Sequence, residues 1–99
     1  MDIQKSIRMA VDTGKVLLGK NESFRSINTG KSKLIILAGN APIDVRVGVK
    51  KRAKLSNISV YEYEGTSIEL GSLCGKPYPI SVMSILDAGD SGILSLGEK

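Results

Sequence analysis

The chain has 99 residues, of which 41% are hydrophobic and 24% are charged, and this ordinary composition predicts one globular domain over residues 1–99. No histidine is present and Cys74 is the only cysteine, which excludes an internal disulfide and removes the commonest metal ligand and the usual base of nucleophilic enzymes. The net charge of +4 is divided into +8 for residues 1–54 and −4 for residues 55–99, which indicates either a basic surface that attracts a polyanion or a mixture of solubilising charges.

Hydrophobic spacing predicts a helix, a strand and a second helix in the first third of the chain. Asp2 is a suitable N-cap for the first helix, which should end near Thr13. Residues 15–18 read as a strand, in which Val16, Leu17 and Leu18 form a short apolar run typical of a buried strand. Asn21 is predicted to be the N-cap of the second helix, and Gly30 is predicted to end it.

The middle of the chain continues the alternation. Residues 34–38 are continuously apolar and β-prone, a pattern typical of a strand that is covered on both faces. Asn40 is predicted to cap a third helix, with Pro42 near its first position and its end near Leu55. Residues 58–63 then alternate like a strand with one wetter face.

The last third is predicted to contain a short helix and a final strand. Thr66 and Glu69 have the three-residue spacing of a capping box and should start a helix that Gly75 closes. Residues 80–86 read as a strand, and the tail after Asp87 is expected to be irregular. The alternating order predicts an α/β fold in which helices cover both faces of a four-stranded sheet.

Residues that carry chemistry are sparse, and we expect no catalytic residue, no metal site and no cofactor. Cys74 stands in an apolar context without a second thiol, so it is expected to be a small buried hydrophobe. Glu62 and Glu64 share one face of a strand and are expected only to contact solvent. The glycines match neither a P-loop nor a dinucleotide-binding fingerprint, so nothing argues for an enzyme.

Three junctions between a strand and the following helix carry polar groups, at residues 19–22, 40–42 and 65–69. If the strands run parallel, their carboxyl ends lie at one edge of the sheet, where α/β proteins form binding sites. The first junction, Gly19-Lys20-Asn21-Glu22, offers backbone N–H groups to an anion together with side chains that suit nucleobase edges. Plain helix capping by the Asn or Thr of each junction is the alternative.

Three further features bear on this candidate site. Arg25 lies three residues after Glu22 and should return to the same side of the helix. Ile68 is apolar at an exposed step from loop to helix, where it suits packing against an unstacked RNA base or belongs to the core. The basic run Lys50–Lys54 is either an RNA contact or a solvated helix face.

Blocks of sequence in a fixed order carry a resemblance to a known family: Asp12–Lys15, Gly30–Ile36, Ala38–Pro42, Leu55–Ser56, Val60–Ser67, Glu69–Gly71, Cys74–Lys76, Val82–Ile85 and Asp87–Ser91. Over nearly its whole length the chain resembles the archaeal form of the large-subunit ribosomal protein family called L-thirty-e. This resemblance implies a three-layer α/β/α sandwich with a mixed sheet. It also implies binding to a kink-turn, a bent RNA element with sheared G·A pairs and a splayed base.

The resemblance also implies roles for individual residues of the first junction. Gly19 would let the RNA backbone approach closely. Asn21 and Glu22 would read base edges at the G·A pairs or the neighbouring bulge. Lys20 and Arg25 would supply contacts to phosphates.

At the other two junctions, Asn40 matches a loop asparagine that contacts RNA, and Gly65, Thr66 and Ile68 lie in the loop that cradles the extruded base. The expected partners are ribosomal RNA and the ribosome, with a monomer outside it. The amphipathic N-terminal stretch and the lack of an apolar run near 18 residues predict neither a signal peptide nor a membrane span. We therefore expect a cytoplasmic, non-enzymatic protein.

Two alternatives remain open at this point. Lys20-Asn21-Glu22 is more similar to the guide-RNA branch of the wider superfamily, to which the protein called L-seven-Ae belongs, so the chain fits a kink-turn-binding component of a guide-RNA modification complex. From another class, a small α/β regulatory domain would bind an anion or metabolite at the same sheet edge.

Overall fold

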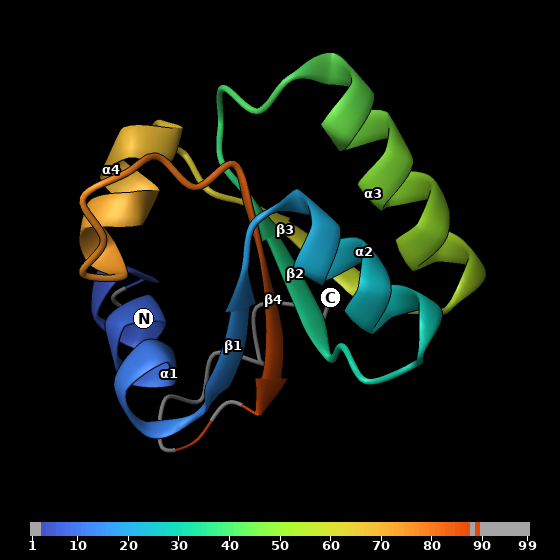
Figure 1. The fold of residues 1–99 in the computed structure, drawn as a ribbon, viewed down its shortest axis with the longest axis horizontal. Helices are drawn as coiled ribbons and strands as arrows, with labels where there is room; N and C mark the ends of the chain where they lie inside the picture. Colours follow the sequence, from blue (N-terminus) through green and yellow to red (C-terminus); the bar gives the residue numbers. More distant parts are fainter. Residues whose placement is uncertain (1–2, 88, 90–99) are drawn as a thin grey trace.

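The computed structural model describes residues 3–87 and residue 89 (Figure 1). Helices and strands alternate along the chain as predicted: α1 (Ile3–Thr13), β1 (Lys15–Leu18), α2 (Lys20–Asn28), β2 (Leu34–Leu37), α3 (Ile43–Leu55), β3 (Ser59–Glu62), α4 (Ser67–Leu73) and β4 (Val82–Asp87). The expected cap Asp2 and nearly all of the tail expected to be irregular lie outside the described residues.

The four strands form one mixed sheet in the order β1-β4-β2-β3. Strand β4 runs antiparallel to both β1 and β2, while β2 and β3 are parallel, with Leu34 opposite Ser59. Strands β1, β2 and β3 therefore share one direction. Their carboxyl ends and the entry to β4 all lie at the same edge of the sheet.

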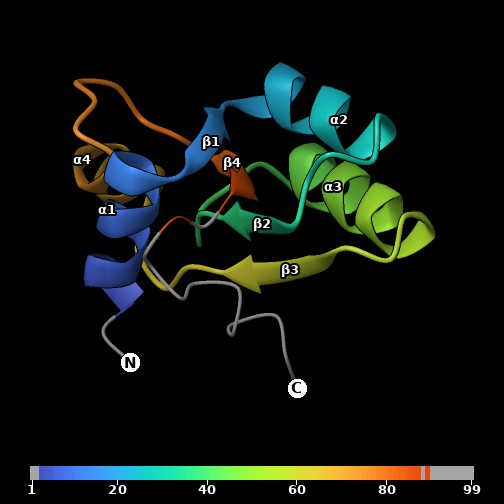
Figure 2. The ribbon, with the colours of Figure 1, turned by 90° about the horizontal axis from the view of Figure 1, so that it is seen from below.

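Helices cover both faces of this sheet, with α1 and α4 on one side and α2 and α3 on the other (Figures 1 and 2). Strand β2 is buried along its whole length and alternates between the two cores. Leu34 and Ile36 pack with α1 and α4, whereas Ile35 and Leu37 pack with α2 and α3. The fold is thus a three-layer α/β/α sandwich, as predicted.

The start of α2 corrects the prediction that Asn21 is its cap. The N-cap is Gly19, with φ 102° and ψ 165°, a conformation that L side chains rarely adopt. The N–H of Gly19 is bonded to the Val82 carbonyl at 2.9 Å, which ties the end of β1 to β4. Asn21 consequently lies inside the first turn of α2.

The prediction for Asn40 was wrong in a similar way. The N-cap of α3 is Pro42, and the Asn40 side chain accepts a hydrogen bond from the Ser67 N–H at 2.7 Å, at the start of α4. The predicted capping at Thr66 is confirmed, since its hydroxyl accepts from the Glu69 N–H at 3.2 Å.

Cys74 is buried, and its thiol lies 3.9 Å from the Met83 sulfur. Burial raises the pKa of Cys74 to about 11, so the thiolate is not populated at neutral pH. This confirms the expectation that Cys74 is a small buried hydrophobe.

A small group of buried serines lies between α2 and the sheet. The Ser84 hydroxyl accepts a hydrogen bond from Ser26 and donates one to Ser32, both at 2.8 Å. The hydroxyl of Ser23 is also buried, but it has no hydrogen-bond partner among residues 3–87 and 89. These buried serines therefore make unequal contributions to stability.

Replacing Ser84 by Ala should lower the free energy of unfolding by about 1 kcal/mol, the usual net value of one hydrogen bond. The loss is limited because the Ser26 hydroxyl keeps the Ser23 carbonyl, 2.8 Å away, as an acceptor. Ser23→Ala removes an unpartnered hydroxyl and should cost nothing. The urea midpoints of the two variants, at an unchanged m-value, measure both losses of stability. If Ser23→Ala lost as much stability as Ser84→Ala, the assignment of the Ser23 hydroxyl as unpartnered would be wrong.

Candidate functional site

The candidate site is the edge of the sheet at which the carboxyl ends of β1, β2 and β3 meet. We call this edge the rim, and it consists of residues 19–22, 38–42, 63–68 and 76–81. Backbone hydrogen bonds join its segments: Ala38 N–H to Ser81 carbonyl and Gly39 N–H to Gly65 carbonyl, both 2.8 Å. The predicted convergence of the three junctions is thus confirmed.

Residues 76–81 were missing from the sequence-based site. They belong to the rim because β4 is antiparallel and lies between β1 and β2, so the chain must enter it at this edge. The N–H of Ile80 donates to the Ser67 carbonyl at 2.9 Å, which docks this segment on α4. Nothing in the local sequence announces the direction of β4.

The N-terminus of α2 is open. Its glycine cap makes no side-chain hydrogen bond to the first turn, and the first intrahelical bond runs from the Ser23 N–H to the Gly19 carbonyl at 3.1 Å. The backbone N–H groups of residues 20–22 therefore have no intrahelical acceptor. Lys20 and Asn21 are exposed beside them. Such an arrangement favours an anion together with a hydrogen-bonding group.

Glu22 and Arg25 lie on the same side of α2, as their spacing predicts. Their charged groups approach to 3.7 Å, and the Arg25 side chain is 74% exposed. Arg25 thus reaches the side of α2 that carries the open N-terminus, and most of its guanidinium remains available to a partner.

The N-terminus of α4 differs from that of α2 because side-chain oxygens of the protein already accept hydrogen bonds from its backbone N–H groups. Asn40 binds the Ser67 N–H and Thr66 binds the Glu69 N–H. The carbonyl oxygen of the Asn40 amide is therefore occupied, while its NH2 group is the part of the side chain that can donate to a partner. Asn40 and Thr66 shape the rim, and α2 supplies its open helix N-terminus.

Glycines allow two rim segments to approach closely. A Cβ at position 39 would lie 2.9 Å from the Gly65 carbonyl oxygen, and a Cβ at position 65 would meet the ring of Tyr63. Gly39 therefore allows the segments that follow β2 and β3 to pack closely, whereas Gly65 leaves room for the Tyr63 ring of its own segment.

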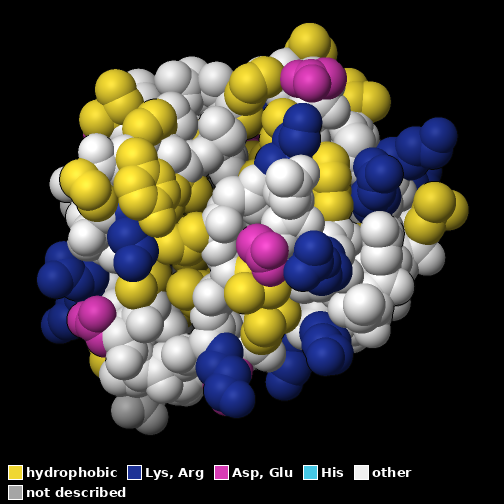
Figure 3. Space-filling model, in the orientation of Figure 1, with side chains coloured by type: hydrophobic (Ala, Val, Ile, Leu, Met, Phe, Trp, Pro, Cys, Tyr) yellow, Lys and Arg dark blue, Asp and Glu magenta, His cyan; other side chains and the backbone are white. Residues whose placement is uncertain are grey.

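A hollow of about 350 Å³ opens beside α4, and it is lined by Ile68, Ser72, Lys76, Pro77, Tyr78 and Pro79. The side chains of Ile68 and Tyr78 are 69% and 53% exposed, which is high for large apolar groups. Figure 3 shows hydrophobic side chains gathered over α4 and the segment that leads into β4. Ile68 is thus an exposed rim residue and not part of the core.

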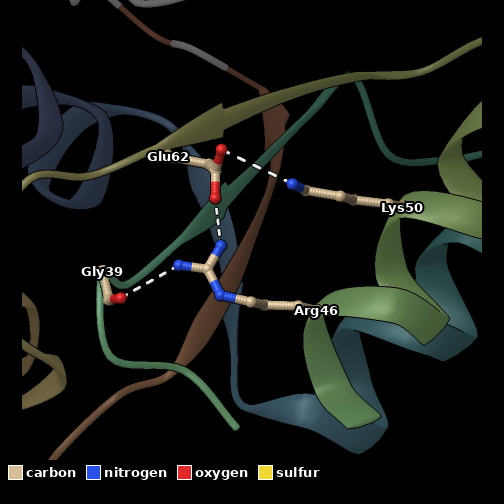
Figure 4. Close-up of polar contacts among 4 residues, drawn as sticks. All are labelled: Gly39, Arg46, Lys50 and Glu62. Atoms are coloured by element: carbon tan, nitrogen blue, oxygen red, sulfur yellow. Dashed lines mark hydrogen bonds and ion pairs between the residues drawn. The ribbon is translucent and has the colours of Figure 1, made fainter. Parts of the chain in front are cut away.

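An ion-pair cluster fixes α3 against the sheet behind the rim (Figure 4). The guanidinium of Arg46 binds the Glu62 carboxylate and also donates to the Gly39 carbonyl at 2.9 Å, and Lys50 lies 3.5 Å from Glu62. Hydrogen bonding from Arg46 and the charge of Lys50 lower the pKa of Glu62. The prediction that Glu62 only contacts solvent was therefore wrong.

This cluster also divides the basic run of α3. Lys50 is paired with Glu62, and the Arg52 guanidinium lies 4.4 Å from the centroid of the Phe24 ring. Lys51 and Lys54 are exposed. Part of this run therefore serves the contacts of α3 with β3 and α2 and is not purely a solvated face.

Among residues 3–87 and 89, no group of three or more His, Cys, Asp or Glu side chains is placed to hold a metal ion. In the same residues, no helix has the length and apolar character needed to cross a membrane.

The comparison with a family profile and the comparison with individual proteins identify the same family. Residues 1–95 match the profile described as the ribosomal protein L7Ae/L30e/S12e/Gadd45 family. The chain is 52% identical over 99 residues to the large ribosomal subunit protein eL30 of Methanocaldococcus jannaschii, covering all of this chain and 90% of that protein. It is 49% identical over 98 residues to eL30 of Methanosphaera stadtmanae, covering 99% and 100% of the two chains.

Replacing Glu62 by Gln should reduce the free energy of unfolding at pH 7 by up to about 1 kcal/mol, the range of exposed ion pairs. Because folding lowers the pKa of Glu62, its ion pairs stabilise the protein above the ordinary value near 4.5. This stabilisation is lost as the pH falls through the folded-state pKa. The free energies of unfolding of the wild type and of Glu62→Gln, measured by chemical unfolding from pH 7 to pH 3, should therefore converge.

Glu64→Gln is the matched control, since Glu64 is exposed and forms no ion pair within the described part of the chain. A Glu62→Gln difference that stays constant as the pH falls, or that Glu64→Gln reproduces, would contradict the role assigned to Glu62.

Proposed function

Because the chain belongs to the ribosomal protein L7Ae/L30e/S12e/Gadd45 family, we propose that it is a structural constituent of the large ribosomal subunit and binds ribosomal RNA there. A cytoplasmic location follows from a place on the ribosome. The role that we propose for the chain is then binding and not catalysis.

At a finer level, we propose that the rim binds a kink-turn-like or internal-loop element. The observation that carries this proposal is the open N-terminus of α2, which presents backbone N–H groups beside the exposed side chains of Lys20 and Asn21. The N–H groups, Lys20 and Arg25 bind phosphates and supply affinity. Asn21 and Glu22 contact base edges and supply selection.

The rest of the rim receives the splayed base. Ile68 and Tyr78 present exposed apolar surface to a base that has left its stack, as single-stranded RNA bases commonly require. Asn40 and Thr66 hold the start of α4 beside this surface, and Gly39 lets the loop after β2 approach the segment of Gly65. The amide NH2 of Asn40 is left to donate to the RNA.

A guide-RNA component for RNA modification is the nearest second function, favoured by the Asn21-Glu22 pair at the open helix end. It would use the same rim and the same binding chemistry. The ranking of affinities for ribosomal and guide-RNA kink-turns distinguishes the two functions.

The experiment that tests the proposal is a gel-shift titration at moderate salt with two RNAs. One is a generic kink-turn, and the other is the same hairpin with its G·A pairs replaced by Watson–Crick pairs. We expect binding to the kink-turn to be at least tenfold tighter, about 1.4 kcal/mol. Equal and salt-sensitive binding to both RNAs would reduce the rim to a basic surface. Stabilisation of the protein by nucleotides or phosphate without RNA would favour a metabolite-binding domain.

Asn21→Ala should lower kink-turn affinity by about 1–3 kcal/mol, the value of a good base-edge contact, and should leave binding to the Watson–Crick hairpin unchanged. Helix capping does not confound this result, because Gly19 is the cap of α2. Asn28→Ala, at the exposed other end of α2, is the matched control. Equal losses on both RNAs would remove Asn21 from base reading.

Ile68→Ala should weaken kink-turn binding by about 1–2 kcal/mol, because it removes aliphatic carbons that pack on the extruded base, each worth about 0.8 kcal/mol when fully buried. Leu55→Ala is a suitable control because Leu55 is 80% exposed, compared with 69% for Ile68, and lies at the far end of α3. Equilibrium titrations of both variants measure the effect. An Ile68→Ala variant that binds like the wild type would show that the hollow beside α4 takes no base.

A further inference from the structure

A second cationic surface lies away from the rim. Residues 20–54, which form α2, β2, α3 and their connections, carry nine Lys or Arg and two Asp or Glu, a net charge of +7 in a chain whose total is +4. Five of these cations lie toward the end of the α2 and α3 layer that is opposite the rim, and we call them the basic patch: Lys31, Lys33, Lys51, Arg52 and Lys54.

The fold brings the two halves of the basic patch together. Strands β2 and β3 are parallel neighbours with Leu34 opposite Ser59, so the segment that enters β2 runs beside the segment that leaves α3. Arg52 of α3 also lies over the Phe24 ring of α2. Figures 1 and 2 both show the loop after α2 next to the C-terminal end of α3.

Among the residues that the structure describes, the cations of the basic patch have no acidic partner, unlike Arg25, Arg46 and Lys50. Arg46 and Lys50 share the Glu62 carboxylate, and Arg25 is paired with Glu22. Within the described part of the chain, none of the five patch residues forms an ion pair, and all five are exposed. The remaining acidic residue of this layer, Asp44, is in the first turn of α3, at its other end.

Exposed cations on long side chains suit a surface of repeated negative charge that needs no fixed geometry. The RNA phosphate backbone is such a surface, and lysines bind it without reading sequence. We propose that the basic patch binds the phosphate backbone of a second RNA segment. The rim and the patch are at opposite ends of α3, whose 13 residues span about 20 Å, so both can be occupied together.

The first test is the binding of a plain RNA duplex, without a kink-turn, at several salt concentrations. Lys33→Gln with Lys54→Gln should make the slope of log affinity against log salt shallower by about 2, one for each lost phosphate contact. The matched control is Lys5→Gln with Arg8→Gln, which removes the same charge from exposed positions on α1, across the sheet. Equal slopes for the two double variants would overturn the proposal.

A second measurement separates this proposal from the function of the rim. The Lys33→Gln and Lys54→Gln double variant should keep the wild-type preference for the kink-turn over its Watson–Crick hairpin, whereas Asn21→Ala should keep wild-type duplex binding. If the wild type shows no kink-turn preference, the function proposed for the rim fails. The salt dependence of duplex binding still tests the proposal for the basic patch. A double variant that loses the kink-turn preference would show that the patch is not a separate surface.

A third measurement tests the class of partner. We expect a polyglutamate chain to compete poorly with the duplex for the wild-type protein at equal total charge. If polyglutamate instead binds as tightly as the duplex and depends equally on Lys33 and Lys54, the surface fits an acidic protein segment and the assignment to RNA is wrong.

Discussion

Burial of β2 on both faces is the constraint from which the rest of the architecture follows. All four of its residues are buried, so helices must cover both sides of the sheet, and its backbone groups can pair only with strands on either side. With β4 antiparallel on one side and β3 parallel on the other, the chain leaves β2 and β3 at one edge and enters β4 there. The rim is the consequence of this pairing. The core therefore fixes the backbone on which the exposed side chains of the rim are carried.

The rim is held together mainly by backbone groups. The bonds of Gly19 to Val82, Ala38 to Ser81 and Gly39 to Gly65 join its segments without using the side chains that face outward. Asn40 is an exception, because its side-chain carbonyl oxygen accepts a hydrogen bond from the Ser67 N–H at the start of α4. Because backbone hydrogen bonds hold the rim together, the side chains of Lys20, Asn21 and Ile68 stay exposed. A backbone that is already ordered loses little conformational entropy when a partner binds.

The sequence predicts the order of elements well because each helix and strand has a local signal, such as the apolar run of β2 or the capping box at Thr66. The errors are those in which a distant contact outweighs a local preference. Asn21 is a good cap by type, but Gly19 adopts a φ of 102° that places the cap two residues earlier. Asn40 caps α4 instead of α3, and Glu62 is paired by side chains 12 and 16 residues away in sequence. The direction of β4, and with it the place of residues 76–81, depends on pairing across the whole chain and has no local signal.

The distribution of charge shows how one small domain can separate affinity from selection. Glu62 is placed where α3 faces β3, and it takes up the charge of Arg46 and Lys50 while Arg46 holds the Gly39 carbonyl. The same pairing that fixes the rim therefore offsets part of the positive charge behind it, since one carboxylate faces two cations. Lys31, Lys33, Lys51 and Lys54 have no such partner within the described residues, so the free charge is concentrated at the opposite end of the layer. On the functions proposed for the rim and the patch, selective reading and unspecific attraction for a polyanion lie at different ends of α3, so a change in one need not weaken the other.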